Sequence, residues 1–174
     1  MNVDPPPDRR TVRKAQLAQL RTLIAALAKS NRSYSPALTA AGVDQNVASL
    51  DQFTARMPVT TKQQLVDNQR DHPPYGTNLT FEVDRYSRFS QTSATTGVPL
   101  RWLDTPQSWS WMLDNWAQVY DACGVTDTDR IFFAFSFGPF LGFWTAFEAA
   151  ARLGCLCIPS GGMSSAARLA AIVD

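Results

Sequence analysis

Two long segments of the chain place apolar residues at helical spacing. The first begins at Asp8, a residue type that caps helix N-termini, and is expected to continue to about Ser30. The second begins with Thr105 and Pro106, a capping residue followed by proline at the first helical position, and Gly124 should end it. We interpret the two apolar stripes as core positions: Leu17, Leu20, Ile24 and Leu27, then Trp109, Met112, Leu113, Trp116, Tyr120 and Cys123.

Shorter apolar segments predict strands. Residues 84–92 alternate as a strand does, and residues 100–103 continue as a strand after a polar loop. Residues 130–135 and 155–159 are apolar runs of strand length, typical of parallel strands buried on both faces.

Helices are expected between and after these runs. A turn at residues 136–139 should lead into a helix that Gly154 ends, and Ser164 should cap a last helix. The helix that Gly154 ends carries four residues on one side: Phe140, Trp144, Phe147 and Ala151. The alternation of strands and helices predicts an α/β fold, with an N-terminal helical segment (residues 1–80) followed by part of a mostly parallel βαβαβ sheet (residues 81–174).

Composition narrows the classes of function. A net charge of +1 does not predict a nucleic-acid partner. The longest apolar run, residues 131–144, is shorter than the roughly 20 apolar residues that span a membrane, and no signal-peptide pattern opens the chain. Cys155 and Cys157 resemble buried reduced thiols, and the single His72 argues against a zinc site. We therefore expect a cytoplasmic protein without membrane, nucleic-acid or structural-metal partners.

Residues 92–97 form the most distinctive polar segment. Thr92, Ser93, Thr95 and Thr96 surround Ala94 and precede Gly97, and Pro99 follows. Hydroxyl-rich segments compete with regular secondary structure, so a loop is expected here. Its hydroxyl and N–H donors suit an anionic ligand such as a polyphosphate, although an ordinary Ser/Thr-rich turn is the alternative. The Walker motif is absent.

This loop resembles the phosphate-binding loop of adenylate-forming (AMP-binding) enzymes. Around it, Pro58-Val59-Thr60-Thr61-Lys62, Phe135-Ser136-Phe137-Gly138 and Pro159-Ser160-Gly161-Gly162 resemble segments of phenylacetate–CoA ligase and its relatives, in that order. The similarity covers roughly residues 30–174 and implies the first part of the N-terminal domain of that family.

The resemblance implies an ATP-dependent acid–thiol ligase. Such an enzyme adenylates a carboxylic acid and passes the acyl group to coenzyme A, with Mg²⁺ accompanying ATP. The implied phosphate-binding residues are Thr92, Ser93, Thr95, Thr96 and Gly97. Phe135, Ser136, Phe137, Gly138, Gly161 and Gly162 would border the pocket for the small-molecule acid, and Lys62 matches a family lysine. The aromatic residues favour an aryl or medium-sized apolar acid, although core packing explains them equally well.

Two departures and one absence leave other functions open. Ala94 replaces a family glycine, and Val98 stands where a basic residue is common. No lysine follows Lys62, so the family's C-terminal lysine has no counterpart and no catalytic residue is assigned. We expect the chain alone to be an inactive, truncated domain whose exposed sheet edge promotes a homodimer. The alternatives are a non-catalytic nucleotide- or acyl-binding module, and an adenylating enzyme that uses an amine or a carrier protein as acceptor.

Overall fold

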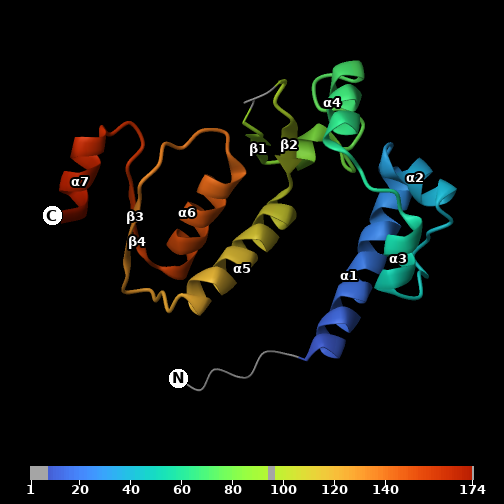
Figure 1. The fold of residues 1–174 in the computed structure, drawn as a ribbon, viewed down its shortest axis with the longest axis horizontal. Coiled ribbons are helices and arrows are strands. Elements are labelled where there is room, and N and C mark those ends of the chain that lie inside the picture. The colour runs from blue at the N-terminus through green and yellow to red at the C-terminus, as the bar shows by residue number, and fades with distance from the viewer. Residues whose placement is uncertain (1–7, 94–96, 174) are drawn as a thin grey trace. The chain divides into compact units, whose positions relative to one another are not determined.

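A computed structural model describes residues 8–93 and 97–173, and the chain divides into two compact units. The first unit is Met1–Val83 and the second is Asp84–Asp174. Figure 1 shows helices only in the first unit and both helices and strands in the second. Each unit has its own buried core, so each is described by itself.

The first unit is built from four helices: α1 (Arg9–Ser30), α2 (Tyr34–Ala40), α3 (Leu50–Arg56) and α4 (Lys62–Asp71). The prediction that Asp8 caps the first helix is confirmed, because its carboxylate accepts hydrogen bonds from the N–H groups of Arg10 and Thr11. The core is small, and its four buried side chains are Ile24, Leu38, Val43 and Val47. The expected apolar stripe of α1 packs against this core.

A buried asparagine organises the end of α1. Asn31 is 1% exposed. Its Oδ1 accepts from the N–H groups of Ser33 and Tyr34, and its Nδ2 donates to the carbonyl of Asn78 and the hydroxyl of Thr80. Because all of its polar atoms are paired, the buried amide joins the α1–α2 connection to residues 78–80 without an unpaired polar group.

The second unit begins with η1 (Val83–Arg85) and an antiparallel hairpin, β1 (Arg88–Gln91) and β2 (Arg101–Asp104). Its register pairs Arg88 with Asp104 and Gln91 with Arg101. The strand expected over residues 84–92 is thus shorter, and β2 pairs with β1 in the antiparallel sense. Only the residues 92–100 separate β1 from β2, which is enough for a hairpin but not for the crossover that a parallel pair needs.

The remainder of the second unit alternates helices and strands: α5 (Pro106–Ala122), β3 (Arg130–Phe133), α6 (Leu141–Leu153), β4 (Leu156–Pro159) and α7 (Ser165–Val173). β3 and β4 are parallel, and α6 forms the crossover between them. Among the described residues, each sheet has two strands, so the α/β class is confirmed while the larger parallel sheet stays a prediction. Figure 1 shows α5 and α6 side by side, where they pack together.

Packing in the second unit depends on small residues of α6. Its buried side chains are Thr145, Ala146, Ala149 and Ala150, whereas Ala151 is exposed and Trp144 is 40% exposed. The side of α6 that carries the alanines is therefore the buried one, and α5 packs against this helix. On α5, Trp109 and Leu113 are buried as expected, and Cys123 is exposed.

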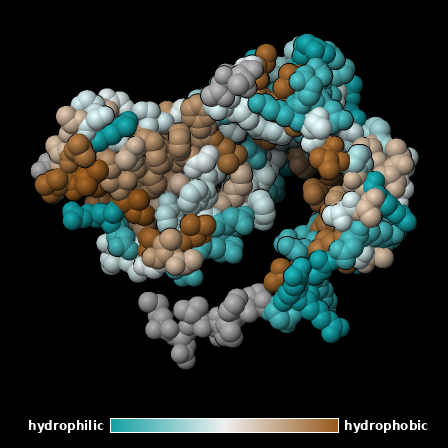
Figure 2. Space-filling view, in the orientation of Figure 1, coloured by the Kyte–Doolittle hydropathy of each residue, from teal (hydrophilic) through white to brown (hydrophobic). Residues whose placement is uncertain are grey.

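Exposed apolar residues gather on α7. Figure 2 shows hydrophobic colour over this helix, where Leu169, Ile172 and Val173 are 66%, 57% and 87% exposed. None of the helices that the structure describes is both long and apolar enough to cross a membrane.

Candidate functional site

The polar loop is closed at its base by two hydrogen bonds between the same pair of residues. The Thr92 N–H donates to the Leu100 carbonyl at 3.0 Å, and the Leu100 N–H donates to Thr92 Oγ1 at 3.0 Å. Thr92 is therefore part of the closure, with only its own hydroxyl proton left to donate. Ala94, Thr95 and Thr96 lie outside the described residues, so their roles stay predictions.

Beyond this closure, the described loop residues are accessible. Ser93 and Gly97 are exposed. A Cβ added to Gly97 would meet nothing within 4 Å, and its φ is not positive. The backbone at Gly97 consequently has room for the close approach of a ligand, and no strained conformation explains the glycine.

A direct hydrogen bond joins the strand before the loop to the turn that follows β3. The Gln91 N–H donates to the Pro139 carbonyl at 2.7 Å. Gln91 immediately precedes the loop, and Pro139 follows the turn Phe135-Ser136-Phe137-Gly138. Two of the segments singled out in the sequence are therefore adjacent in the structure.

The aromatic residues of the turn after β3 pack against α6. Phe135 stacks on Phe143 with ring centroids 4.3 Å apart, and Phe137 lies 4.6 Å from Trp144 and 5.3 Å from Phe147. Both turn residues are half-buried, so one side of each ring serves the core and the rest stays accessible. They form an apolar wall of the kind that borders small-molecule pockets.

The turn after β4 lies against the turn after β3. Ser160 is fully buried, and its hydroxyl donates to the Phe133 carbonyl at 2.7 Å. A Cβ added to Gly161 would lie 3.8 Å from the Phe137 ring, and Gly162 has a φ of 82°. Glycine at position 162 permits this left-handed backbone, and Gly161 lies beside Phe137 at an ordinary packing distance.

Arg168 also contacts both turns, although the sequence reasoning did not single it out. Its Nη2 donates to Ser136 Oγ at 3.1 Å, and its Nε donates to the Ser160 carbonyl at 3.4 Å. The sequence contained a signal for this residue, because Arg168 is the one charged residue between Arg152 and Asp174. A lone charge in an apolar helix indicates a specific partner.

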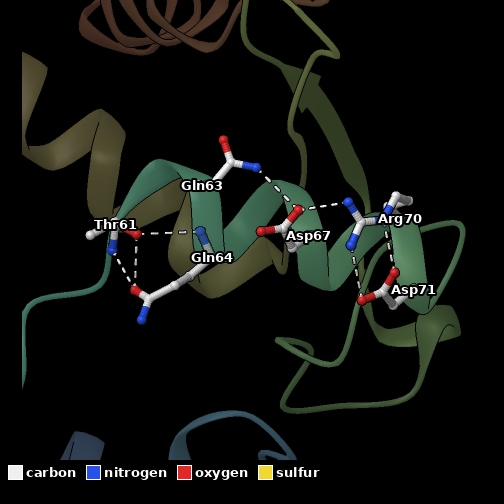
Figure 3. A network of polar contacts seen from close by, with 6 residues as sticks. All are labelled: Thr61, Gln63, Gln64, Asp67, Arg70 and Asp71. Carbon is white, nitrogen blue, oxygen red and sulfur yellow. Dashed lines mark hydrogen bonds and ion pairs between the residues drawn. The ribbon is translucent and has the colours of Figure 1, made fainter.

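Lys62 belongs to the other unit. It is the first residue of α4 and is exposed, and no hydrogen bond or ion pair involves it in the part of the chain that the structure describes. The N-terminus of α4 is stabilised by a capping box between Thr61 and Gln64. Figure 3 shows this box and the ion pairs of Arg70 with Asp67 and Asp71 on the same helix.

The residues before Lys62 line an open groove of about 220 Å³ in the first unit. Pro58, Val59 and Thr60 form one side, and the hydroxyls of Tyr34 and Thr60 lie 3.4 Å apart at its edge. The motif around Lys62 is thus concave and mostly apolar, whereas the polar loop belongs to the second unit.

The polar loop and the turns after β3 and β4 carry no charged side chains. Residues 89–100, 131–139 and 159–167 include no Asp, Glu, Lys or Arg, so these three segments offer hydroxyl and N–H donors without an acid or a base. The nearby Cys157 thiol has a pKa above its ordinary value, first because it is buried and then because Cys155 lies close. Within residues 8–93 and 97–173, no cluster of three or more His, Cys, Asp or Glu could hold a metal ion. The segments therefore present hydrogen-bond donors that suit an anion, and none of their side chains is an acid or a base at neutral pH.

Comparisons with known proteins relate the chain to coenzyme A ligases. No family model matches it. Phenylacetate-coenzyme A ligase of Escherichia coli (strain K12) is 33% identical over 111 residues, which are 62% of this chain and 23% of that protein.

Solved structures of 2-hydroxyisobutyryl-CoA ligase share the fold. A structure with 2-HIB-AMP and CoA in the thioesterification state is 25% identical with a TM-score of 0.84, over 99% of this chain and 39% of that one. An open conformation with the same two ligands is 24% identical with a TM-score of 0.83, and 43% of its chain is covered. The chain thus spans less than half the length of these proteins. In sequence, the chain is therefore similar to part of a phenylacetate-coenzyme A ligase, and in fold to part of 2-hydroxyisobutyryl-CoA ligase.

Proposed function

We propose that the chain is the N-terminal part of an acid–coenzyme A ligase, which adenylates a carboxylic acid with ATP and passes the acyl group to coenzyme A. The observation that carries this proposal is the 2.7 Å hydrogen bond from the Gln91 N–H to the Pro139 carbonyl. Because it joins the polar loop to the aromatic turn, a phosphate held by the first and an acid held by the second would lie side by side. Holding two reactants together accounts for much of the rate enhancement of such enzymes.

Thr92, Ser93, Thr95, Thr96 and Gly97 would bind the phosphates of ATP. The fit rests on the open space at Gly97 and on the exposure of Ser93, which leave backbone and hydroxyl donors free to approach an anion. ATP supplies the activating phosphoanhydride, and Mg²⁺ would neutralise part of its charge. The residues of this chain would hold the phosphates with hydrogen bonds, which strengthen when the acceptor is charged.

Phe135, Ser136, Phe137 and Gly138 would border the acid, together with Gly161 and Gly162. The half-buried rings of Phe135 and Phe137 support an aryl or medium-sized apolar acid, because they present an apolar surface beside polar backbone. The acceptor could equally be an amine or a carrier protein, since none of these segments contacts it. Lys62 stays a possible site residue to which no role is assigned.

At the level of domains, we propose a helical segment over residues 1–80 and the first part of an adenylate-forming domain over residues 81–174. The latter would contribute to a larger, mostly parallel sheet. The exposed Leu169, Ile172 and Val173 of α7 support self-association as a homodimer.

A non-catalytic nucleotide- or acyl-binding module is the second candidate. It is favoured by Ala94 and Val98, which depart from the family pattern of the loop, and by the lack of charged residues in the three site segments. Both candidates bind ATP at the same loop, and they differ in turnover.

The test of the phosphate site is the double variant Thr95→Ala with Thr96→Ala in this chain. Each lost hydrogen bond to a charged phosphate is worth about 1.5–3 kcal/mol, so the ATP affinity measured by calorimetry should fall by at least about tenfold. Thr54→Ala is the control, because its hydroxyl is exposed on α3 and donates only to the Asp51 carbonyl. An unchanged affinity in the double variant would contradict the phosphate assignment.

The same preparation tests whether these residues suffice for turnover. We expect ATP binding without acid-dependent exchange of pyrophosphate into ATP from the 174-residue chain, because the proposed site holds the phosphates and only part of a pocket for the acid. Exchange with phenylacetate, benzoate or a medium-chain acid would show that these residues suffice for adenylation, and it would exclude the binding module.

A further inference from the structure

Side chains from three elements of the second unit meet at Glu148 of α6. Arg88, the first residue of β1, donates through Nη2 to both carboxylate oxygens, at 3.1 and 2.9 Å. Trp109 of α5 donates through Nε1 to Oε2 at 2.8 Å. The guanidinium carbon of Arg88 lies 5.2 Å from the centroid of the Trp109 ring, which completes the triangle with a cation–π contact.

This triad is partly shielded from water. Trp109 is 7% exposed, and the side chains of Glu148 and Arg88 are 26% and 45% exposed. Partial burial reduces screening by salt, and hydrogen bonds to a carboxylate are stronger than those between neutral groups. Each of the three side chains contacts the other two, so the triad fixes their relative positions better than an isolated surface ion pair would.

The triad holds one end of β1, and a backbone hydrogen bond holds the other. Arg88 begins the strand and contacts Glu148, while Gln91 ends it and donates to the Pro139 carbonyl just before α6. The polar loop starts at the next residue, Thr92. The start of the loop is thereby placed by contacts at both ends of one short strand.

We propose that Arg88, Glu148 and Trp109 are positioning residues, which hold the base of the polar loop against the turn after β3. They fix the separation between the phosphate-binding and acid-binding parts of the proposed site without contacting either ligand. The identity of those ligands rests on the proposed function, whereas the placement of the loop base does not.

The chain offers a matched control on the same helix pair. Arg152 of α6 donates to Asp114 of α5 at 2.6 Å, and this exposed ion pair does not involve β1. Asp114→Asn therefore removes an ion pair between α5 and α6 and leaves the triad intact. Glu148→Gln removes the charge of the triad and keeps the size of the side chain and an oxygen that can accept from Trp109.

The first measurement is amide hydrogen exchange in the two variants. In Glu148→Gln, we expect the Gln91 and Thr92 N–H groups to exchange at least about fivefold faster, while the Leu156 N–H of β4 keeps its rate. The indole N–H resonance of Trp109 should shift as well, because its acceptor loses its charge. Asp114→Asn should change none of these. Unchanged exchange at Gln91 and Thr92 in Glu148→Gln, or an equal rise at Leu156, would overturn the proposal.

The second measurement is the ATP affinity of the same variants. Glu148→Gln should weaken binding by about threefold or more relative to Asp114→Asn, since the loop base is no longer held in place. If wild type binds ATP and Glu148→Gln binds it equally well, the triad does not position the site and the proposal is overturned. If wild type binds no ATP, the proposed function fails, and the exchange rates at Gln91 and Thr92 still decide whether the triad positions the loop base.

Discussion

The antiparallel hairpin and the parallel strand pair both carry polar turns, but they use their hydroxyls differently. After β4, the Ser160 hydroxyl is fully buried and donates to Phe133, so it contributes to the structure. After β1, Thr92 closes the loop, while Ser93 and Gly97 beyond it are exposed. A donor that a fold already uses is not available to a ligand. The comparison therefore supports the proposal that the hairpin loop binds phosphate and that the turns of the parallel pair shape the pocket.

The two regions also differ in how closely their glycines are packed. A Cβ at Gly138 would lie 2.8 Å from the Phe140 ring, whereas one at Gly97 would meet nothing within 4 Å. The turn after β3 thus depends on a missing side chain for its packing. The polar loop has open space at Gly97, as a ligand-binding site requires.

The largest effect should come from comparing two single variants, Gly138→Ala and Gly97→Ala, which test the difference in packing between the two glycines. Gly138→Ala forces the Phe140 ring to move within the aromatic cluster, and overpacking of this kind costs about 1–3 kcal/mol. Thermal unfolding should show a lower Tm for Gly138→Ala. Gly97→Ala should change stability by less than about 0.5 kcal/mol, as exposed substitutions usually do. Equal effects of the two substitutions would show that the packing difference is not real.

The rate at which the Cys157 thiol of β4 is alkylated should report on how far the parallel strand pair is buried. The pKa of Cys157 is raised, so less of its reactive thiolate is present at pH 8 than in an exposed cysteine. Cys123 is exposed. We expect Cys123 to be alkylated at least about tenfold faster, as followed by peptide mass spectrometry. The rate at Cys157 should approach that of Cys123 only at higher pH or after unfolding. Comparable rates at pH 8 would contradict the partial burial of Cys157.

Two buried serines should respond in opposite directions, with the smallest effects. Ser160→Ala loses a buried hydrogen bond and should destabilise the chain by about 1 kcal/mol in urea unfolding. Ser90 of β1 is 4% exposed, and its hydroxyl has no hydrogen-bond partner among the described residues. Ser90→Ala should therefore be neutral or stabilising by up to about 1 kcal/mol. A clear destabilisation by Ser90→Ala would reveal a partner for this hydroxyl.

Local signals predicted the helix ends well. Asp8 caps α1, and Thr105 caps α5 by accepting from the Ser108 N–H. Gly124 and Gly154 follow α5 and α6 with positive φ values of 75° and 98°, as the sequence predicted. These features depend on a few neighbouring residues, so they can be read without knowledge of the rest of the chain.

Contacts between distant segments were predicted less well. Nothing in the local sequence showed that the alanines of α6 are its buried residues, because that depends on how α5 packs against it. The contacts of Arg168 with Ser136 and of Glu148 with Arg88 join residues 32 and 60 positions apart, so spacing along the chain did not predict them. The antiparallel pairing of residues 101–104 with β1 was not predicted either, because a strand can pair with any of several segments.

The sequence by itself determined the α/β class, the capped helices and the hydroxyl-rich loop, because spacing and residue type act over one or two turns of chain. Only the tertiary structure decided that β1 and β2 form a hairpin, and that Gln91 lies beside Pro139. It alone showed that the Thr92 N–H and the Ser160 hydroxyl donate within the fold, while the hydroxyl proton of Thr92 has no acceptor assigned among the described residues and Ser93 and Gly97 are exposed. The physical reason is that a hydroxyl has the same chemistry wherever it stands in the chain, and only its neighbours in space determine whether it stabilises the fold or remains available to a ligand.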